Sequence, residues 1–159
     1  MASTKYLNFV GQYIDGYMGT FSCNTMPDIA PQLQKQGFIV NLDPSYMPGS
    51  HWVSVFMRTY GGVVNCQYFD SFGHAVNHVI MDKLGWSCDD IVVNKTQVQH
   101  FSSQHCGLFA LAHIIYNLLN DDIDGFTTIF DRNYLSNNDD IVTRYIVNNI
   151  SLCKHYNYL

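Results

Sequence analysis

Two runs of β-forming residues separated by a pair of glycines constrain this chain most. The runs over 51–60 and 63–70 are rich in Val, Phe and Tyr, and Gly-Gly stands between them at 61–62. Two glycines between such runs are typical of a two-residue hairpin turn. The sequence therefore predicts an antiparallel hairpin whose open end brings His51 beside Asp70.

The rest of the chain mixes short apolar runs with apolar residues at helical spacing. The predicted helices cover 4–14, 74–85, 107–119 and 139–150, and further strands are predicted over 37–42, over 91–93 and around 98, with a loop after the first helix. This order predicts an α+β fold, in which helices flank a central mixed sheet of short strands. A single domain over 1–159 fits the length of the chain.

Composition narrows the class of protein. Hydrophobic residues make up 47% of the chain and aromatic residues 14%, which is enough for a real core and argues against disorder. The net charge is −5 with only eight Lys and Arg residues, which argues against non-specific nucleic-acid binding. No signal peptide is visible, and no apolar run approaches the ~18 residues of a membrane span.

The five cysteines are an odd number and contain no C-x-x-C pair. That pattern argues against a disulfide framework and against a zinc site. It predicts a reducing, intracellular setting for the chain.

Cys106 stands where a polar loop over 100–105 enters the apolar helix predicted over 107–119. A helix N-terminus presents unpaired N–H groups and the positive end of the helix dipole, and both favour a thiolate. Gly107 would let the backbone come close to a substrate carbonyl. The alternative is that Cys106 is a small buried hydrophobe, as most free cysteines are.

His51 precedes the first strand of the predicted hairpin, and Asp70 ends the second. A carboxylate in that place can accept the Nδ1–H of His51, fix its tautomer and stabilise the imidazolium. The alternatives are a surface histidine and an Asp that only initiates a turn.

Three other histidines compete for a role. His105 is adjacent to Cys106, and neighbouring loop residues rarely direct both side chains to one reaction centre. His74 and His78 lie four apart on a predicted helix and could hold a metal. Without a third ligand in view, a solvated helix face is the preferred interpretation, and no metal or cofactor is predicted.

Gln99 is the candidate for a side-chain oxyanion donor. Its amide can donate a hydrogen bond to the oxygen of a tetrahedral intermediate together with the backbone N–H of Cys106. Gln97 and Gln104 are competitors, and Gln104 is too close to Cys106 along the chain to fold back easily.

These residues in this order resemble the adenovirus-type (adenain-like) maturation proteases and the related SUMO-deconjugating proteases. The resemblance runs from about residue 9 to residue 120. The motifs on which the resemblance rests are His-Trp at 51–52, Asp before a Gly-containing turn at 70–73, Gln99, and Cys-Gly-Leu-Phe at 106–109. Gln99 lies seven residues before the cysteine, as in the adenovirus enzymes. The Asp at the acid position is closer to the SUMO-protease version.

The resemblance implies a cysteine endopeptidase with Cys106, His51, Asp70 and Gln99 as catalytic residues. It also implies a narrow substrate cleft roofed by aromatic side chains such as Trp52, and Gly107 is the second predicted substrate-binding residue. The expected substrates are viral capsid or core precursors, cleaved next to small residues such as Gly during virion maturation. The expected location is the virion and the interior of the infected cell, and the expected state is a monomer, which an activating peptide could assist. The acidic charge argues against the DNA dependence of the adenovirus enzymes.

Two rival functions remain open at this point. The same chemistry could remove SUMO-like or ubiquitin-like proteins from their conjugates. A lesser alternative is a catalytically inactive relative that serves as a virion or binding protein.

Overall fold

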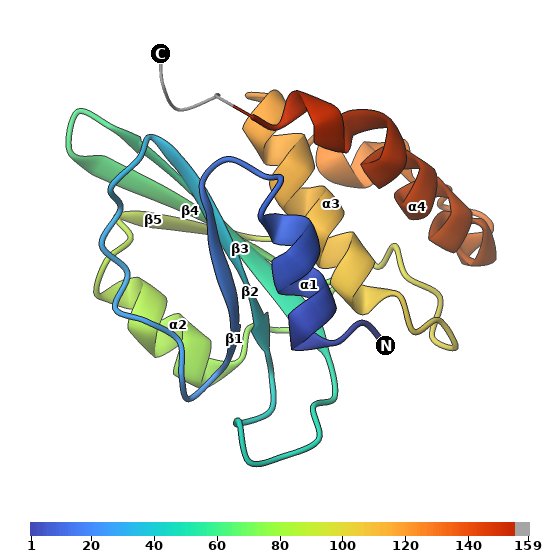
Figure 1. Cartoon of the computed structure of the whole chain (residues 1–159), viewed down its shortest axis with the longest axis horizontal. Helices are drawn as coiled ribbons and strands as arrows, with labels where there is room; N and C mark the ends of the chain where they lie inside the picture. The colour runs from blue at the N-terminus through green and yellow to red at the C-terminus, as the bar shows by residue number, and fades with distance from the viewer. Residues whose placement is uncertain (155–159) are drawn as a thin grey trace.

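The computed structural model describes residues 1–154. Its centre is a five-stranded sheet whose strands follow one another in space as they do in the sequence (Figure 1). The strands are β1 (Tyr17–Ser22), β2 (Lys35–Asn41), β3 (Trp52–Tyr60), β4 (Val63–Phe69) and β5 (Asp90–Val93). β2, β3 and β4 pair antiparallel, whereas both outer strands run parallel to their neighbours. The predicted mixed sheet of an α+β fold is confirmed.

Helices cover both faces of this sheet (Figure 1). The α-helices are α1 (Thr4–Gly11), α2 (His78–Gly85), α3 (Cys106–Leu119) and α4 (Asn138–Asn149). Three short 3-10 helices are η1 (Phe126–Ile129), η2 (Leu135–Asn137) and η3 (Ile150–Leu152). α1, α3 and α4 lie on one face, and α2 lies on the other. Among residues 1–154, no helix has the length and apolar character needed to cross a membrane.

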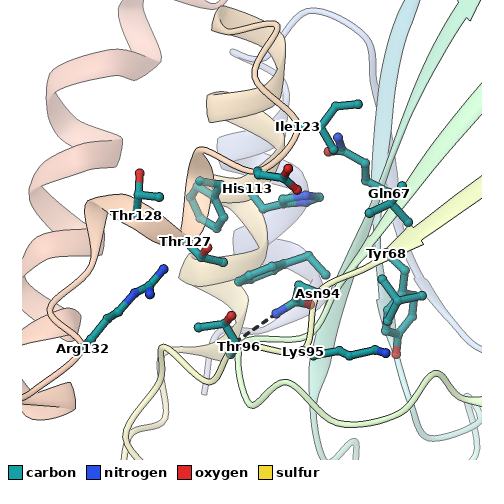
Figure 2. Close-up of a pocket in the computed structure, with 15 residues that line it drawn as sticks. Gln67, Tyr68, Asn94, Lys95, Thr96, His113, Ile123, Thr127, Thr128 and Arg132 are labelled. Atoms are coloured by element: carbon teal, nitrogen blue, oxygen red, sulfur yellow. Dashed lines mark hydrogen bonds between the residues drawn. The ribbon is translucent and has the colours of Figure 1, made fainter.

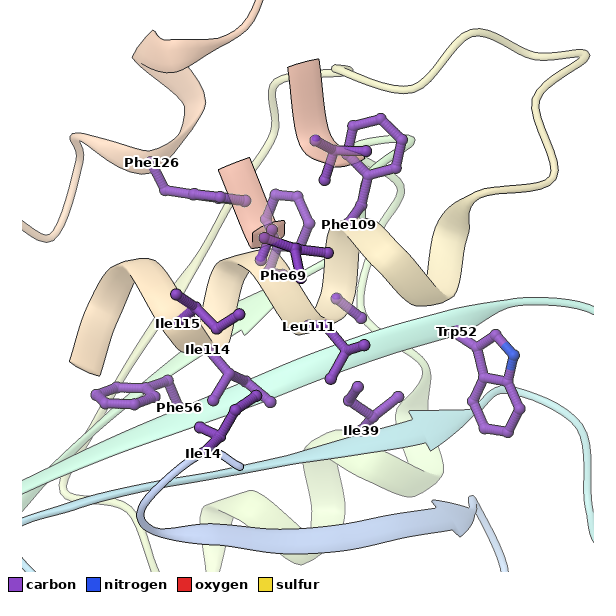
Figure 3. Close-up of a cluster of buried hydrophobic side chains, with 14 of the residues drawn as sticks. Ile14, Ile39, Trp52, Phe56, Phe69, Phe109, Leu111, Ile114, Ile115 and Phe126 are labelled. Carbon is purple, nitrogen blue, oxygen red and sulfur yellow. The ribbon is translucent and has the colours of Figure 1, made fainter. Parts of the chain in front are cut away.

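The central strands supply both faces of the sheet with apolar side chains. Alternate residues of a strand point to opposite faces, so Ile39 joins the core under α3, while its neighbours Phe38 and Val40 join the core under α2. Figure 3 shows the α3 core, in which Ile114 and Leu111 lie over the sheet. α3 is therefore a largely buried helix, and its first two residues are buried as well.

The β3–β4 hairpin has the predicted register. Tyr60 pairs with Val63 at the turn, and Ser54 pairs with Phe69 at the other end. The glycines at 61–62 have φ of 56° and 80°, which ordinary residues rarely adopt. The hairpin therefore holds the residues that flank its open end close together.

Some boundaries differ from the predictions. α1 ends at Gly11, where the ring of Tyr17 fills the space that a Cβ would need. β1 was not predicted, because it is a half-buried edge strand whose register is interrupted between Tyr17 and Thr20. α2 begins only at His78, because the Asn77 side chain caps the helix there. Residue 98 lies outside any strand.

The prediction against disulfide bonding is wrong for one pair of cysteines. Cys66 on β4 is bonded to Cys88, which precedes β5, with their Cα atoms 5.9 Å apart. The parallel pairing of β4 with β5 brings the two residues together. Cys23, Cys106 and Cys153 are free thiols and all are buried.

Candidate active site

The open end of the hairpin brings His51 and Asp70 into contact, as predicted. His51 directly precedes β3 and Asp70 directly follows β4. The Nε2 of His51 lies 2.7 Å from Oδ1 of Asp70, and both side chains are buried. The prediction that Nδ1 would face the carboxylate is wrong. The imidazole ring stacks on Phe72, with ring centroids 4.8 Å apart, and in that orientation Nε2 points to Asp70.

A tight turn and one distant side chain hold Asp70 in place. Its Oδ1 accepts a hydrogen bond from the N–H of Phe72 at 2.8 Å. Gly73 closes the turn with φ of 70°, and a Cβ there would lie 2.8 Å from the carbonyl oxygen of Lys95. Asn94 accepts from the N–H of Asp70 at 2.8 Å and donates to its carbonyl at 2.9 Å. Sequence reasoning missed Asn94, because no local sequence pattern indicates that it is hydrogen-bonded to a residue 24 positions away.

Cys106 is the first residue of α3, and its thiol lies close enough to His51 to raise the pKa of that ring. Because Nε2 of His51 is occupied by Asp70, Nδ1 is the ring nitrogen left for the thiol. The side chain of Cys106 is only 4% exposed. The Cys106 thiol, the His51 imidazole and the Asp70 carboxylate therefore lie in one continuous line, the reactive line of the site.

The start of α3 offers hydrogen-bond donors beside this thiol. His105 is the N-cap residue, and its side chain makes no capping hydrogen bond in the described chain. The first N–H groups of a helix have no partners inside the helix. The N–H groups next to the Cys106 sulfur can therefore stabilise negative charge that develops on a substrate oxygen.

The surroundings of His51 favour its protonated form. Burial lowers its pKa, but hydrogen bonds to Asp70 and Cys106 and their negative charges outweigh that effect and raise the pKa to about 9. At neutral pH the ring can therefore exist as an imidazolium beside the Asp70 carboxylate and the Cys106 sulfur. Such an arrangement supports nucleophilic attack followed by proton donation to a leaving group.

Gln99 is completely buried between the Asp70 turn and the loop that leads to Cys106. Its Oε1 accepts from the hydroxyl of Ser71 at 2.5 Å, and its Nε2 donates to the carbonyl and hydroxyl oxygens of Ser103 at 2.9 and 3.2 Å. Its competitors Gln97 and Gln104 are both exposed. The role of Gln99 as an oxyanion donor stays a prediction.

Trp52 and Gly107, which are predicted to bind substrate, both contact the N-terminal segment. Trp52 is buried, and its Nε1 donates to the carbonyl of Ala2 at 2.9 Å. A Cβ on Gly107 would lie 3.1 Å from the Cβ of Ala2 and 3.2 Å from Leu7. The missing side chain of Gly107 thus makes room for these residues, and the substrate-binding role of both positions stays a prediction.

Among the other histidines, His74 approaches the Asp70 end of the reactive line, with Nδ1 4.0 Å from Oδ2 of Asp70. His74 precedes α2 rather than lying on it, so the prediction that His74 and His78 share one helix face is wrong. Its ring stacks on Phe72 at 5.7 Å. His105 faces Asp139, with Nδ1 3.2 Å from Oδ2. Within residues 1–154, no group of three or more His, Cys, Asp or Glu side chains is arranged to hold a metal ion.

A cavity of about 450 Å³ lies between β4, β5 and η1 (Figure 2). Gln67 and His113 line it from the sheet and from α3, and Arg132 lines it from the opposite side. Cys106 and His51 are not among its lining residues. Asn94 lines the cavity and also accepts a hydrogen bond from the N–H of Asp70. The cavity therefore borders a residue that positions Asp70, and it does not reach Cys106.

Known proteins resemble this chain in sequence and in fold. No family model matches it. A cysteine protease of African swine fever virus is 28% identical over 135 residues, which cover 77% of this chain and 45% of that protein. The chain thus spans about half the length of this relative.

The crystal structure of the pS273R protease of the same virus has a TM-score of 0.60 at 16% identity, covering 82% of this chain and 59% of that one. A structure of AvrA with IP6 and CoA has a TM-score of 0.49 at 17% identity, covering 90% of this chain and 53% of the other. The likeness to pS273R shows that the two chains share a fold in which helices flank a central sheet.

Proposed function

We propose that this chain is a cysteine endopeptidase in which Cys106 is the nucleophile, His51 the acid and base, and Asp70 the residue that orients His51. The observation that carries the proposal is the buried line from the Cys106 thiol through the His51 ring to the Asp70 carboxylate. A nucleophile beside a base, with a third group hydrogen-bonded to that base, is the signature of covalent acyl transfer. The relative in African swine fever virus, named a cysteine protease, supports the same chemistry.

In the proposed reaction, His51 holds the thiol proton while the Cys106 sulfur attacks the scissile carbonyl carbon. The electron pair of the carbonyl moves to its oxygen, where the N–H groups at the start of α3 and the Gln99 amide stabilise the charge. His51 then protonates the leaving amine as the carbon–nitrogen bond breaks. Water, deprotonated by His51, hydrolyses the thioester, which frees the new carboxyl terminus and restores the thiol.

The proposed substrates are capsid or core precursor proteins of a virus, cleaved next to small residues such as Gly. The viral origin of the similar protease supports this choice. The proposed location is the virion and the interior of the infected cell, where the chain would act as a monomer, with or without an activating peptide.

Removal of ubiquitin-like proteins is the second candidate function. The residues around Asp70 favour it. The segment at 68–73 reads Tyr-Phe-Asp-Ser-Phe-Gly, which resembles the SUMO-protease version of the motif. Release of a fluorophore from the C-terminus of a ubiquitin-like protein would support this candidate. Cleavage of viral precursors without such release would exclude it.

The test of the proposed function is to map new N-termini by mass spectrometry in a denatured lysate treated with the purified chain. The wild type and a Cys23→Ala control, which alters another buried free thiol, should generate the same new termini. Cys106→Ala should generate none while keeping its circular dichroism spectrum. Cleavage by Cys106→Ala, or no cleavage by the wild type, would overturn the proposal.

A further inference from the structure

The first turn of α4 contacts the loop that carries Gln99 and Cys106 at two separate points. Asn138, fully buried, donates from Nδ2 to the carbonyl of Val98 at 2.7 Å. Asp139 accepts at Oδ1 from the hydroxyl of Ser103 at 2.6 Å. These contacts join residues 40 and 36 positions apart in the sequence. Two neighbouring residues of one helix therefore hold both ends of the segment 98–103.

Gln99 is the side chain enclosed by these contacts. On one side, the Ser71 hydroxyl donates to its Oε1 at 2.5 Å. On the other side, its Nε2 donates to Ser103, whose hydroxyl donates in turn to Asp139. Ser71 also follows Asp70 directly, and its carbonyl accepts from the N–H of Gln99 at 3.0 Å. A continuous series of hydrogen bonds thus runs from the Asp70 turn through Gln99 to α4.

The direction of each bond in this series decides how the amide is oriented. A serine hydroxyl has one hydrogen to donate, and that of Ser103 is given to the Asp139 carboxylate. Ser103 can therefore only accept from Gln99, so it selects the NH₂ end of the amide and not the carbonyl end. The two Ser103 acceptors belong to one residue, and one N–H can serve both in a three-centre bond. A three-centre bond of this kind to Ser103 would leave the second N–H for a substrate oxygen.

We propose that Asp139 is a positioning residue that acts through Ser103 to hold the Gln99 amide with its donor end toward the oxyanion. The inference rests on the proposed function, because it concerns the stabilisation of a tetrahedral intermediate formed on Cys106. α4 is thereby part of the active-site support, although its sequence carries no motif that indicates it.

The first test compares Asp139→Ala with Asp140→Ala as a matched control. Both substitutions remove one negative charge from the first turn of α4, and the Asp140 side chain is exposed. Displacement of a positioned group by about 1 Å can cost ~10²-fold in rate. Asp139→Ala should therefore lower kcat about 10- to 100-fold with little change in KM, and Asp140→Ala should leave kcat unchanged.

A double-mutant cycle shows whether Asp139 acts through Gln99. Gln99→Ala should lower kcat by about 10²–10³-fold, the usual cost of one oxyanion donor. Adding Asp139→Ala to Gln99→Ala should cost no more than about twofold further, because the group that Asp139 positions is already gone. Asp139→Asn, which keeps an oxygen acceptor for the Ser103 hydroxyl, should restore most of the rate. Ser103→Ala should behave like Asp139→Ala and replaces it if that variant does not fold.

Alkylation of Cys106 by iodoacetamide separates positioning from general damage to the site. Alkylation develops no oxyanion, so Asp139→Ala should alkylate at the wild-type rate while it cleaves peptides slowly. An unchanged kcat in both Asp139→Ala and Ser103→Ala, or an equal loss with and without Gln99, would overturn the inference. A parallel loss of alkylation and cleavage would overturn it too. If the wild type cleaves no protein, the proposed function fails first, and that outcome is distinct from the others.

Discussion

His51 and His113 are two buried histidines that lie against consecutive residues of the same hairpin. Phe69, the last residue of β4, stacks on the ring of His113, with centroids 4.8 Å apart. The next residue, Asp70, is hydrogen-bonded to His51. The two histidines are 8% and 4% exposed. Their burial is almost the same, and what differs is the chemistry of their partners.

The partners move the two pKa values in opposite directions. Burial and the positive charge of Arg58 lower the pKa of His113 to about 3, and its partner is the neutral hydroxyl of Ser54 at 2.8 Å. At His51, the carboxylate and the thiol overcome the effect of burial and raise the pKa to about 9. Burial beside a neutral hydroxyl and a positive charge therefore makes a neutral core histidine, whereas a buried carboxylate and a thiol turn the same residue type into an acid and base.

The largest effect should come from replacing each of these histidines with asparagine. His51→Asn should lower kcat/KM by about 10⁴-fold or more, because the general base is lost. His113→Asn should change kcat/KM by less than about threefold but lower the free energy of unfolding by ~1–3 kcal/mol, since the Ser54 hydroxyl loses its partner. Steady-state kinetics and urea unfolding of both variants test this. Similar losses of kcat/KM in the two variants would contradict the view that only His51 takes part in catalysis.

A smaller loss is expected when the carboxylate is removed and the imidazole is kept. Asp70→Asn should lower kcat by about 10²-fold or more, because the ring loses its orienting partner. The pKa of His51 should also fall, since burial still lowers it and the charge that raised it is gone. The alkaline limb of the kcat/KM profile, expected near pH 9 in the wild type, should therefore move to lower pH. An alkaline limb at the same pH in both proteins would show that Asp70 does not raise the pKa of His51.

The smallest effect concerns stability. Because the pKa of folded His51 is raised from 6.5 to about 9, its contribution to stability is fully present below pH 6.5 and is lost as pH rises through 9. Urea unfolding should show a wild-type loss of ~1–3 kcal/mol over this window. Asp70→Asn should lose less over the same window. An equal pH dependence in both proteins would mean that Asp70 does not hold the His51 charge.

The sequence predicts those parts of the molecule that local patterns determine. The hairpin follows from its two glycines and its β-forming strands, and α3 follows from an apolar run after a polar loop. His51, Asp70 and Cys106 lie at the ends of these elements, so their meeting was predictable. β1 was missed because a half-buried, irregular edge strand gives little periodic signal.

The supports of the site were beyond prediction because they cross long stretches of chain. Asn94 contacts Asp70 from 24 residues away, and Asp139 contacts Ser103 from 36 residues away. An Asn or Asp in a loop or at a helix start has many local uses, and none of them indicates a distant partner. The same holds for the pairing of Cys66 with Cys88, since connectivity does not follow from cysteine positions alone.

The most direct test of the central claim is the rate at which iodoacetamide alkylates each free cysteine at pH 6, followed by mass spectrometry. Cys23, Cys106 and Cys153 are all buried, so exposure does not favour one of them. Burial raises the pKa of Cys153 to about 12, which leaves that thiol unreactive. Cys106 should be alkylated at least about tenfold faster than the other two, and His51→Asn should abolish the difference. Equal rates at all three thiols would contradict the account, since no activated nucleophile would then be present.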